Sequence, residues 1–87
     1  MDSLCRLVRE CLGEGKRSLW LNFTRRPGES GREGVALRID RDDLPYFASW
    51  DPRELVGREI IVRGWFHPHK GQLVMRLRQP MAVEFEH

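Results

Sequence analysis

The sequence lacks any long apolar run, and its first residues lack the features of a secretory signal. No apolar stretch approaches the roughly 20 residues that a membrane-spanning helix needs, so we expect no membrane partner. Residues 1–10 mix charged and apolar side chains, whereas a signal peptide has an uninterrupted apolar core. Localisation stays open: we expect a cytoplasmic protein if the chain is complete, and an exported one if it is a domain of a longer protein.

Cysteine is also scarce, and the two that are present do not predict a disulfide. If the segment from Cys5 to Cys11 is a straight strand, six steps of about 3.3 Å separate the two Cα atoms by roughly 20 Å. A disulfide needs Cα atoms about 4.4 to 6.8 Å apart. We therefore expect two separate, buried thiols.

The net charge is small, so overall charge does not attract polyanions. The 15 basic and 13 acidic side chains leave a formal charge of +2, and any affinity for nucleic acid must come from how the charges are distributed. Thirteen of the basic residues are arginines, which favour planar, bidentate contact with phosphate or carboxylate. A chain of 87 residues is long enough for one core, and we expect one domain over residues 1–87.

Alternation of apolar and polar residues with period two predicts strands in most of the chain. The clearest segments are residues 18–23, 35–40, 59–66, 73–78 and, after Pro80, 83–85. Residues 2–12 fit a helix or a strand. We favour the strand, because a four-stranded sheet would leave an exposed edge that a first strand covers.

The connections contain turn-forming residues. Residues 25–34 predict a hairpin loop, and Pro68 and Gly71 punctuate a second hairpin. Between the third and fourth strands, residues 42–57 carry helix start and stop signals that predict one short helix or two single turns. The order β-β-β-α-β-β is that of the oligonucleotide/oligosaccharide-binding (OB) fold, so we predict an all-β domain with one short helix, a five-stranded Greek-key barrel.

Two sequence segments resemble those of a known family. Leu-Trp-Leu-Asn-Phe at 19–23 and Asp-Pro-Arg-Glu-Leu-Val-Gly-Arg-Glu-Ile-Ile-Val-Arg-Gly-Trp-Phe at 51–66 resemble the small OB domains of bacterial thermonuclease-like (staphylococcal-nuclease-like) proteins. The resemblance covers residues 18–86 and implies a bacterial OB domain. It does not imply nuclease activity, because the phrase at 35–40, Val-Ala-Leu-Arg-Ile-Asp, lacks the glycine and the Pro-Glu of the nuclease motif. We predict no catalytic residues.

Two clusters invite a metal-binding interpretation. Asp40, Asp42 and Asp43 would suit a hard cation, but acids at a helix start serve equally as caps, which we favour. His67 and His69 point the same way in an extended chain, yet a structural zinc site needs four ligands and neither cysteine is near in sequence. We therefore expect no metal and no cofactor.

The strand pattern predicts a binding groove on the face opposite the core. An exposed tryptophan beside cations suits single-stranded nucleic acid, because bases stack on the indole and cations neutralise phosphates. Trp50 and Trp65 are expected to pack at the ends of the core, and Trp20 alternatively covers the barrel. The candidate nucleic-acid-binding residues are Lys16, Arg17, Trp20, Asn22, Arg38, His67, His69, Lys70 and Arg76.

Three hypotheses for function follow. The first is a non-catalytic module that binds single-stranded DNA or RNA weakly and with low specificity through the OB groove. The second is a protein-interaction or accessory domain of a longer chain, which predicts an exposed apolar patch in place of a basic groove. The third is a thermonuclease-like phosphodiesterase, which predicts carboxylates that converge with Arg38 around a cleft.

Overall fold

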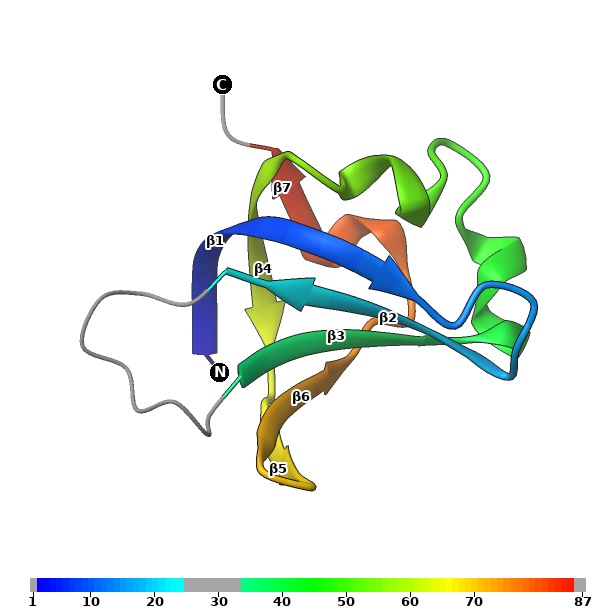
Figure 1. Cartoon of the computed structure of the whole chain (residues 1–87). Coiled ribbons are helices and arrows are strands. Elements are labelled where there is room, and N and C mark those ends of the chain that lie inside the picture. Colours follow the sequence, from blue (N-terminus) through cyan, green and yellow to red (C-terminus); the bar gives the residue numbers. More distant parts are fainter. Residues whose placement is uncertain (1, 25–33, 86–87) are drawn as a thin grey trace.

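The computed structural model describes residues 2–24 and 34–85, which form one hydrogen-bonded β-sheet with short 3-10 helices (Figure 1). The all-β prediction is confirmed. The strands of these residues are β1 (Asp2–Leu12), β2 (Ser18–Phe23), β3 (Gly34–Asp40), β4 (Glu59–Gly64), β5 (His67–His69), β6 (Gln72–Arg76) and β7 (Val83–Phe85). The 3-10 helices are η1 (Arg41–Tyr46), η2 (Pro52–Leu55) and η3 (Pro80–Ala82). None of the described helices is long and apolar enough to cross a membrane.

The sheet has the strand order β5-β6-β3-β2-β1-β4-β7, and its pairs are antiparallel except for the parallel pair β3–β6. The strand prediction for residues 2–12 is confirmed. β1 pairs with β4 through residues 2–7 and with β2 through residues 8–12, and its register shifts between Val8 and Glu10. Because a bulge bends a strand, this shift lets one strand serve two neighbours in different directions.

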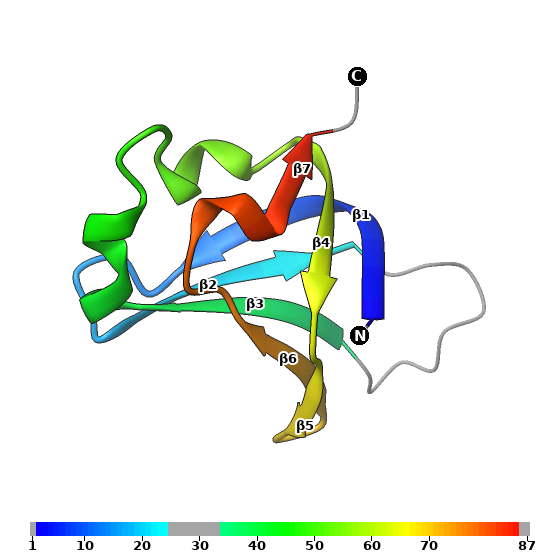
Figure 2. The same cartoon turned by 180° about the vertical axis from the view of Figure 1, so that it is seen from behind.

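The structure does not have the predicted closed barrel of five strands. The segment 59–66 was predicted as one strand, but β4 ends at Gly64 and pairing resumes at His67 with β6 as the partner. The described sheet is therefore open, with β5 and β7 as its edges. Figure 2 shows β4 running past β6 into β5, and a Cβ atom at Gly64 would lie 2.6 Å from the sulfur of Met75 in β6. A side chain at Gly64 would have to displace the flexible end of Met75. This close approach of β4 to β6 shows that the open sheet is strongly rolled.

Two 3-10 helices take the place of the predicted helix between β3 and β4. Pro45 lies inside η1 and Pro52 is the first residue of η2. Proline lacks the backbone N–H that continues a helix, so Pro45 limits the length of η1. At the first position of η2 that N–H has no helical partner, so Pro52 favours the start of the turn. The carboxylate of Asp51 caps η2 by accepting a hydrogen bond of 2.9 Å from the backbone N–H of Arg53. Of the two alternatives left open by the sequence, two single turns is the correct one.

The core lies on the inward face of the strands and follows the predicted alternation. Its members include Leu21, Leu37, Ile39, Ile60, Val62 and Leu77, each completely buried. Ala36 and Val74 are also buried, but they point to the opposite face and do not belong to the core cluster. Something on the outer face of the sheet must therefore cover them.

The prediction that Trp50 and Trp65 pack at the ends of the core is correct for only one of them. Trp50 packs as expected, edge-to-face against Phe47 and Phe85 with ring centroids 5.3 and 5.7 Å away. The same prediction is wrong for Trp65, which is 73% exposed, because it falls in the break between β4 and β5.

Neither cysteine forms a disulfide, as expected, but both are half-buried and not fully buried. The thiol of Cys5 donates a hydrogen bond of 3.3 Å to Glu59, and Cys11 packs partly against the core. Burial, and next the negative charge of Glu14, raises the pKa of the Cys11 thiol. A raised pKa keeps this thiol protonated and chemically inert at neutral pH.

Candidate nucleic-acid interface

The side chain of Trp20 projects from the outer face of β2. Strand alternation buries Leu19 and Leu21 in the core and turns Trp20 and Asn22 outward. In the sheet register, Trp20 lies opposite Arg38 of β3, which in turn lies opposite Arg76 of β6. Three of the predicted binding residues therefore share one cross-strand row.

Trp20 stacks with His69 across two intervening strands. The ring centroids lie 6.1 Å apart and the ring planes differ by 19°. Since β3 and β6 lie between β2 and β5, the β5–β6 hairpin must bend back over this face. Lys70 and Gly71 form the hairpin tip with φ values of 49° and 80°, as a type I′ turn requires.

A cleft of about 300 Å³ opens beside this stack. Four of the predicted residues line it, Trp20, Asn22, His69 and Lys70, together with Leu12 and Gln72. None of these residues is acidic. The amide of Asn22 donates a hydrogen bond of 3.0 Å to Glu10, which leaves it less able to bind a ligand. We call this space the Trp20 cleft.

A second cleft, of about 590 Å³, contains three more of the predicted residues, Lys16, Arg17 and Arg38. Its other lining residues are Gly15, Ser18, Asp40, Arg41 and Asp42. Carboxylates do converge here with Arg38, as the phosphodiesterase hypothesis expects. We call this space the Asp40 cleft.

The carboxylate of Asp40 is already engaged inside the protein. Its Oδ1 accepts a hydrogen bond of 3.1 Å from Ser18 and lies 3.1 Å from Nε of Arg38, which is not aligned to donate to it. Its Oδ2 lies 3.1 Å from Nε of Arg76, and this guanidinium also donates to the buried Asp43 at 3.1 Å. The charges of Arg38 and Arg76 are thus largely compensated.

The remaining cations around these clefts have no such compensation. Within residues 2–24 and 34–85, no carboxylate forms an ion pair with Lys16, Arg17, Arg41 or Lys70. All four are exposed. These four side chains therefore have uncompensated positive charge, whereas the two predicted arginines of the cross-strand row do not.

The acidic cluster does not cap as predicted. Asp40 occupies the position before η1 but its side chain makes no capping hydrogen bond, while Asp42 and Asp43 lie in the first turn. In the described part of the chain, no group of three or more histidine, cysteine, aspartate or glutamate side chains is placed to hold a metal ion. Two members of the cluster, Asp40 and Asp43, instead form ion pairs with the arginines of β3 and β6.

The last two predicted residues, His67 and Arg76, line a third cleft of about 460 Å³ that also contains Trp65. Sequence analysis missed Trp65 as a candidate. The strand pattern does indicate that Trp65 faces outward. It lies an even number of residues from the outward-facing Ile61 and Arg63, whereas the buried Ile60 and Val62 alternate with them.

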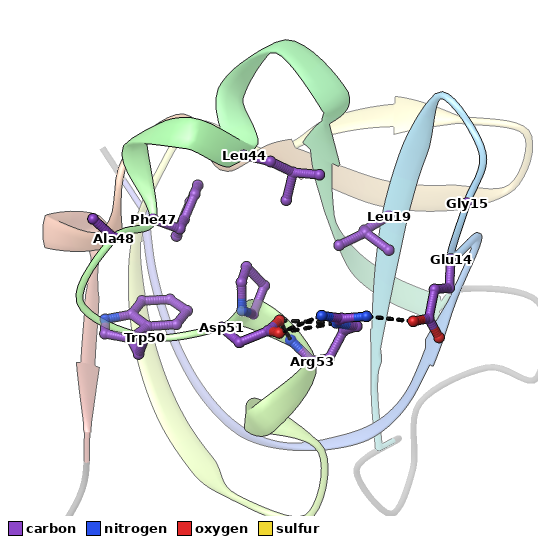
Figure 3. Close-up of a pocket in the computed structure, with 10 residues that line it drawn as sticks. Glu14, Gly15, Leu19, Leu44, Phe47, Ala48, Trp50, Asp51 and Arg53 are labelled. Carbon is purple, nitrogen blue, oxygen red and sulfur yellow. Dashed lines mark hydrogen bonds and ion pairs between the residues drawn. The ribbon is translucent and has the colours of Figure 1, made fainter.

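A different pocket, also of about 460 Å³, lies against the 3-10 helices and contains none of the predicted residues (Figure 3). Leu19, Leu44, Phe47, Ala48 and Trp50 are among its lining side chains. Across the pocket, the guanidinium of Arg53 forms ion pairs with Asp51 and Glu14. The hydrogen bonds from Arg53 lower the pKa of Asp51. We call this space the Trp50 pocket.

No protein-family model matches this chain, and no curated protein or solved structure matches it either. The resemblance to thermonuclease-like OB domains, and the bacterial origin it implies, therefore stay predictions.

Proposed function

We propose that this domain is an OB-type binding module that holds single-stranded DNA or RNA weakly, and with little sequence preference, in the Trp20 cleft. In this proposal the open, rolled sheet is a variant of the OB barrel in which the break after Gly64 divides one strand into β4 and β5. The order β1-β2-β3 and the parallel β3–β6 pair support that relation.

The observation that carries the proposal is the Trp20–His69 stack beside a cleft without acidic lining. Carbon atoms of stacked rings touch at about 3.5 to 4.0 Å. A centroid separation of 6.1 Å between nearly parallel rings therefore means that the imidazole is offset or leaves a gap, and part of the indole face stays uncovered. A nucleobase that joins this stack gains about 1 to 3 kcal/mol.

Charge and hydrogen bonding explain why we expect weak and unspecific binding. The uncompensated cations Lys16, Arg17, Arg41 and Lys70 attract phosphates, but Arg38 and Arg76 are engaged by aspartates. Among the amides of the Trp20 cleft, Asn22 is bound to Glu10. Stacking therefore contributes more than base-specific hydrogen bonds, and stacking accepts any base.

The test is a titration of tryptophan fluorescence with unlabelled single-stranded oligonucleotide at low and at moderate salt. We expect saturable quenching that weakens with salt, because phosphate binding releases counterions. Trp20→Ala should weaken the affinity by about 5- to 150-fold, the equivalent of one stacked base. Tyr46→Ala, which removes an aromatic ring that is 66% exposed on η1, is the matched control and should leave the affinity unchanged. Tryptophan fluorescence that stays unchanged at low salt would refute the proposal.

One observation favours the protein-interaction hypothesis as a second candidate. Trp65 and Met81 are 73% and 85% exposed, and large apolar side chains so exposed often mark an interface. They lie outside the Trp20 cleft. Concentration-dependent self-association, measured by sedimentation and removed by Met81→Ala, would support this candidate.

The phosphodiesterase hypothesis has weaker support. The Asp40 cleft does bring carboxylates to Arg38, but both oxygens of Asp40 already contact side chains of the protein. A metal ion or an attacking water would have to displace these contacts. Incubation of labelled DNA with the protein and Ca²⁺ tests this hypothesis, and we expect no cleavage.

A further inference from the structure

The third cleft combines an exposed tryptophan with a cationic lining. It lies between the end of β4, the strands β5 and β6, and the segment that leads into η3, and its side chains include Trp65, His67, Arg63, Arg76 and Arg78. None of its lining residues is acidic. The indole of Trp65 is 73% exposed, so one face of the ring is open to a flat partner.

The arginines of this cleft differ in how far their charges are compensated. Arg63 forms an ion pair of 3.1 Å with Glu84, and Arg76 is held by Asp40 and Asp43. Arg78 is exposed and forms no ion pair with any residue in the described ranges. An uncompensated guanidinium beside an open indole suits a nucleotide, because the base stacks on the indole and the guanidinium neutralises the phosphate.

The third cleft, which we call the Trp65 cleft, lies next to the Trp20 cleft along β5. His67 lines the Trp65 cleft and His69 lines the Trp20 cleft. The two histidines are two residues apart in one strand, so their side chains point to the same side and lie about 7 Å apart along it. β5 is also an edge strand, so no further strand covers this path among the described residues.

We propose that the Trp65 cleft is a second stacking subsite for the same single-stranded nucleic acid, which runs along β5 from Trp20 to Trp65. Trp65 stacks on a base, and Arg78 neutralises the adjoining phosphate. The proposal rests on the proposed function, because the strand that occupies this subsite is the one held in the Trp20 cleft. Charge selects nucleic acid over an apolar protein partner, since the lining is cationic and lacks carboxylates.

The experiment measures the anisotropy of a dye-labelled oligothymidylate of about 16 nucleotides, the upper end of the site size of one OB domain. The proteins are wild type, Trp65→Ala, Trp65→Phe, Arg78→Glu and Trp20→Ala. Two control variants, Tyr46→Ala and Arg9→Ala, remove an exposed ring and an exposed charge that line none of the three clefts. Circular dichroism confirms that each variant is folded.

Trp65→Ala should weaken the affinity by about 5- to 150-fold, and Trp65→Phe should restore most of it, because phenylalanine keeps a ring for stacking. Arg78→Glu should also weaken the affinity, and the controls should not. If Trp20→Ala weakens binding but the Trp65 and Arg78 variants do not, the second subsite is wrong and the proposed function stands. If only the Trp65 and Arg78 variants weaken binding, the proposed function has the wrong cleft.

If the wild type binds no oligonucleotide, both proposals fail. If Trp65→Ala leaves oligonucleotide binding unchanged but converts a dimer into a monomer, the Trp65 cleft is a protein interface and the subsite is refuted.

Discussion

The Trp50 pocket and the Trp20 cleft each contain a tryptophan, a second aromatic ring and a cation, but in different arrangements. In the Trp50 pocket, the indole meets Phe47 edge-to-face, and Arg53 is held by two carboxylates (Figure 3). The same indole also meets Phe85 edge-to-face. In the Trp20 cleft, the indole stacks nearly parallel to a single imidazole, and Lys70 has no carboxylate partner among the described residues.

If the proposed function holds, the difference in geometry separates a tryptophan and a cation that stabilise the fold from a tryptophan and a cation that bind a ligand. The half-buried indole of Trp50 is held by two edge-to-face ring contacts, and paired guanidinium groups have little charge left for a phosphate. An offset stack leaves part of a ring face open to a ligand, and unpaired cations keep their charge for a phosphate. The number of tryptophans and arginines is therefore less informative than the partners each one has.

The largest expected effect is a loss of stability when the tryptophan of the Trp50 pocket is removed. Trp50→Ala should lower the free energy of unfolding by about 3 kcal/mol, because it removes a large ring packed against the core. Trp20→Ala should cost only about 1 kcal/mol, since its ring is half-buried on the outer face and lies outside the core. Urea unfolding of both variants measures the difference. Equal losses would mean that Trp20 is a structural cover.

The next effect concerns the arginines of the cross-strand row. Arg76→Met keeps the apolar stem but leaves the buried carboxylate of Asp43 without its cation. We expect a loss of about 1 to 3 kcal/mol in the free energy of unfolding. The matched variant Arg17→Met removes an unpaired, exposed guanidinium and should cost almost nothing. If the two variants are equally stable, the aspartate network does not hold the arginine in place.

A smaller effect is expected in the salt dependence of oligonucleotide binding. Each cation that contacts a phosphate of a single strand contributes about 0.7 to the slope of log affinity against log salt concentration. Lys70→Ala should lower the slope by about that amount. Arg53→Ala removes a cation that is already paired with Asp51 and Glu14, and it should leave the slope unchanged. Equal slopes for the two variants would contradict the assignment.

The smallest effect concerns Asp51. Its pKa in the folded protein is lowered from the ordinary 3.8 by hydrogen bonds from Arg53, so the ionised form stabilises the fold above the unfolded pKa. This contribution disappears as the pH falls through the lower, folded pKa. Asp51→Asn keeps a capping side chain without the charge. It should be less stable than wild type at pH 6, by less than about 1 kcal/mol, and equally stable once the pH is below the folded pKa of Asp51.

That comparison requires thermal unfolding of both proteins across this pH range. A stability difference that persists at the acidic end would show that the carboxylate acts through something other than its ionisation.

Much of the secondary structure could be predicted from the sequence, because period-two alternation reports burial directly. The segments 18–23 and 35–40 predicted β2 and β3 almost to the residue. The open sheet could not be predicted, because it depends on which neighbour each half of the segment 59–69 pairs with, and this choice is made by distant strands.

The candidate site was predictable in its residue types but not in its charge balance. Alternation placed Trp20 and Arg38 on the outer face correctly. It could not show that Asp40 and Asp43 reach Arg38 and Arg76, since these contacts join β3, η1 and β6. The alternation that was used for Trp20 would also have placed Trp65 outward, had it been carried through Gly64.

The most direct test of the central claim is the behaviour of the three indole N–H signals in a ¹⁵N-labelled sample during titration with single-stranded oligothymidylate. The account predicts that the signals of Trp20 and Trp65 shift together and saturably, while the signal of Trp50 does not move. A shift of the Trp50 signal alone, or no shift of any of the three, would contradict it.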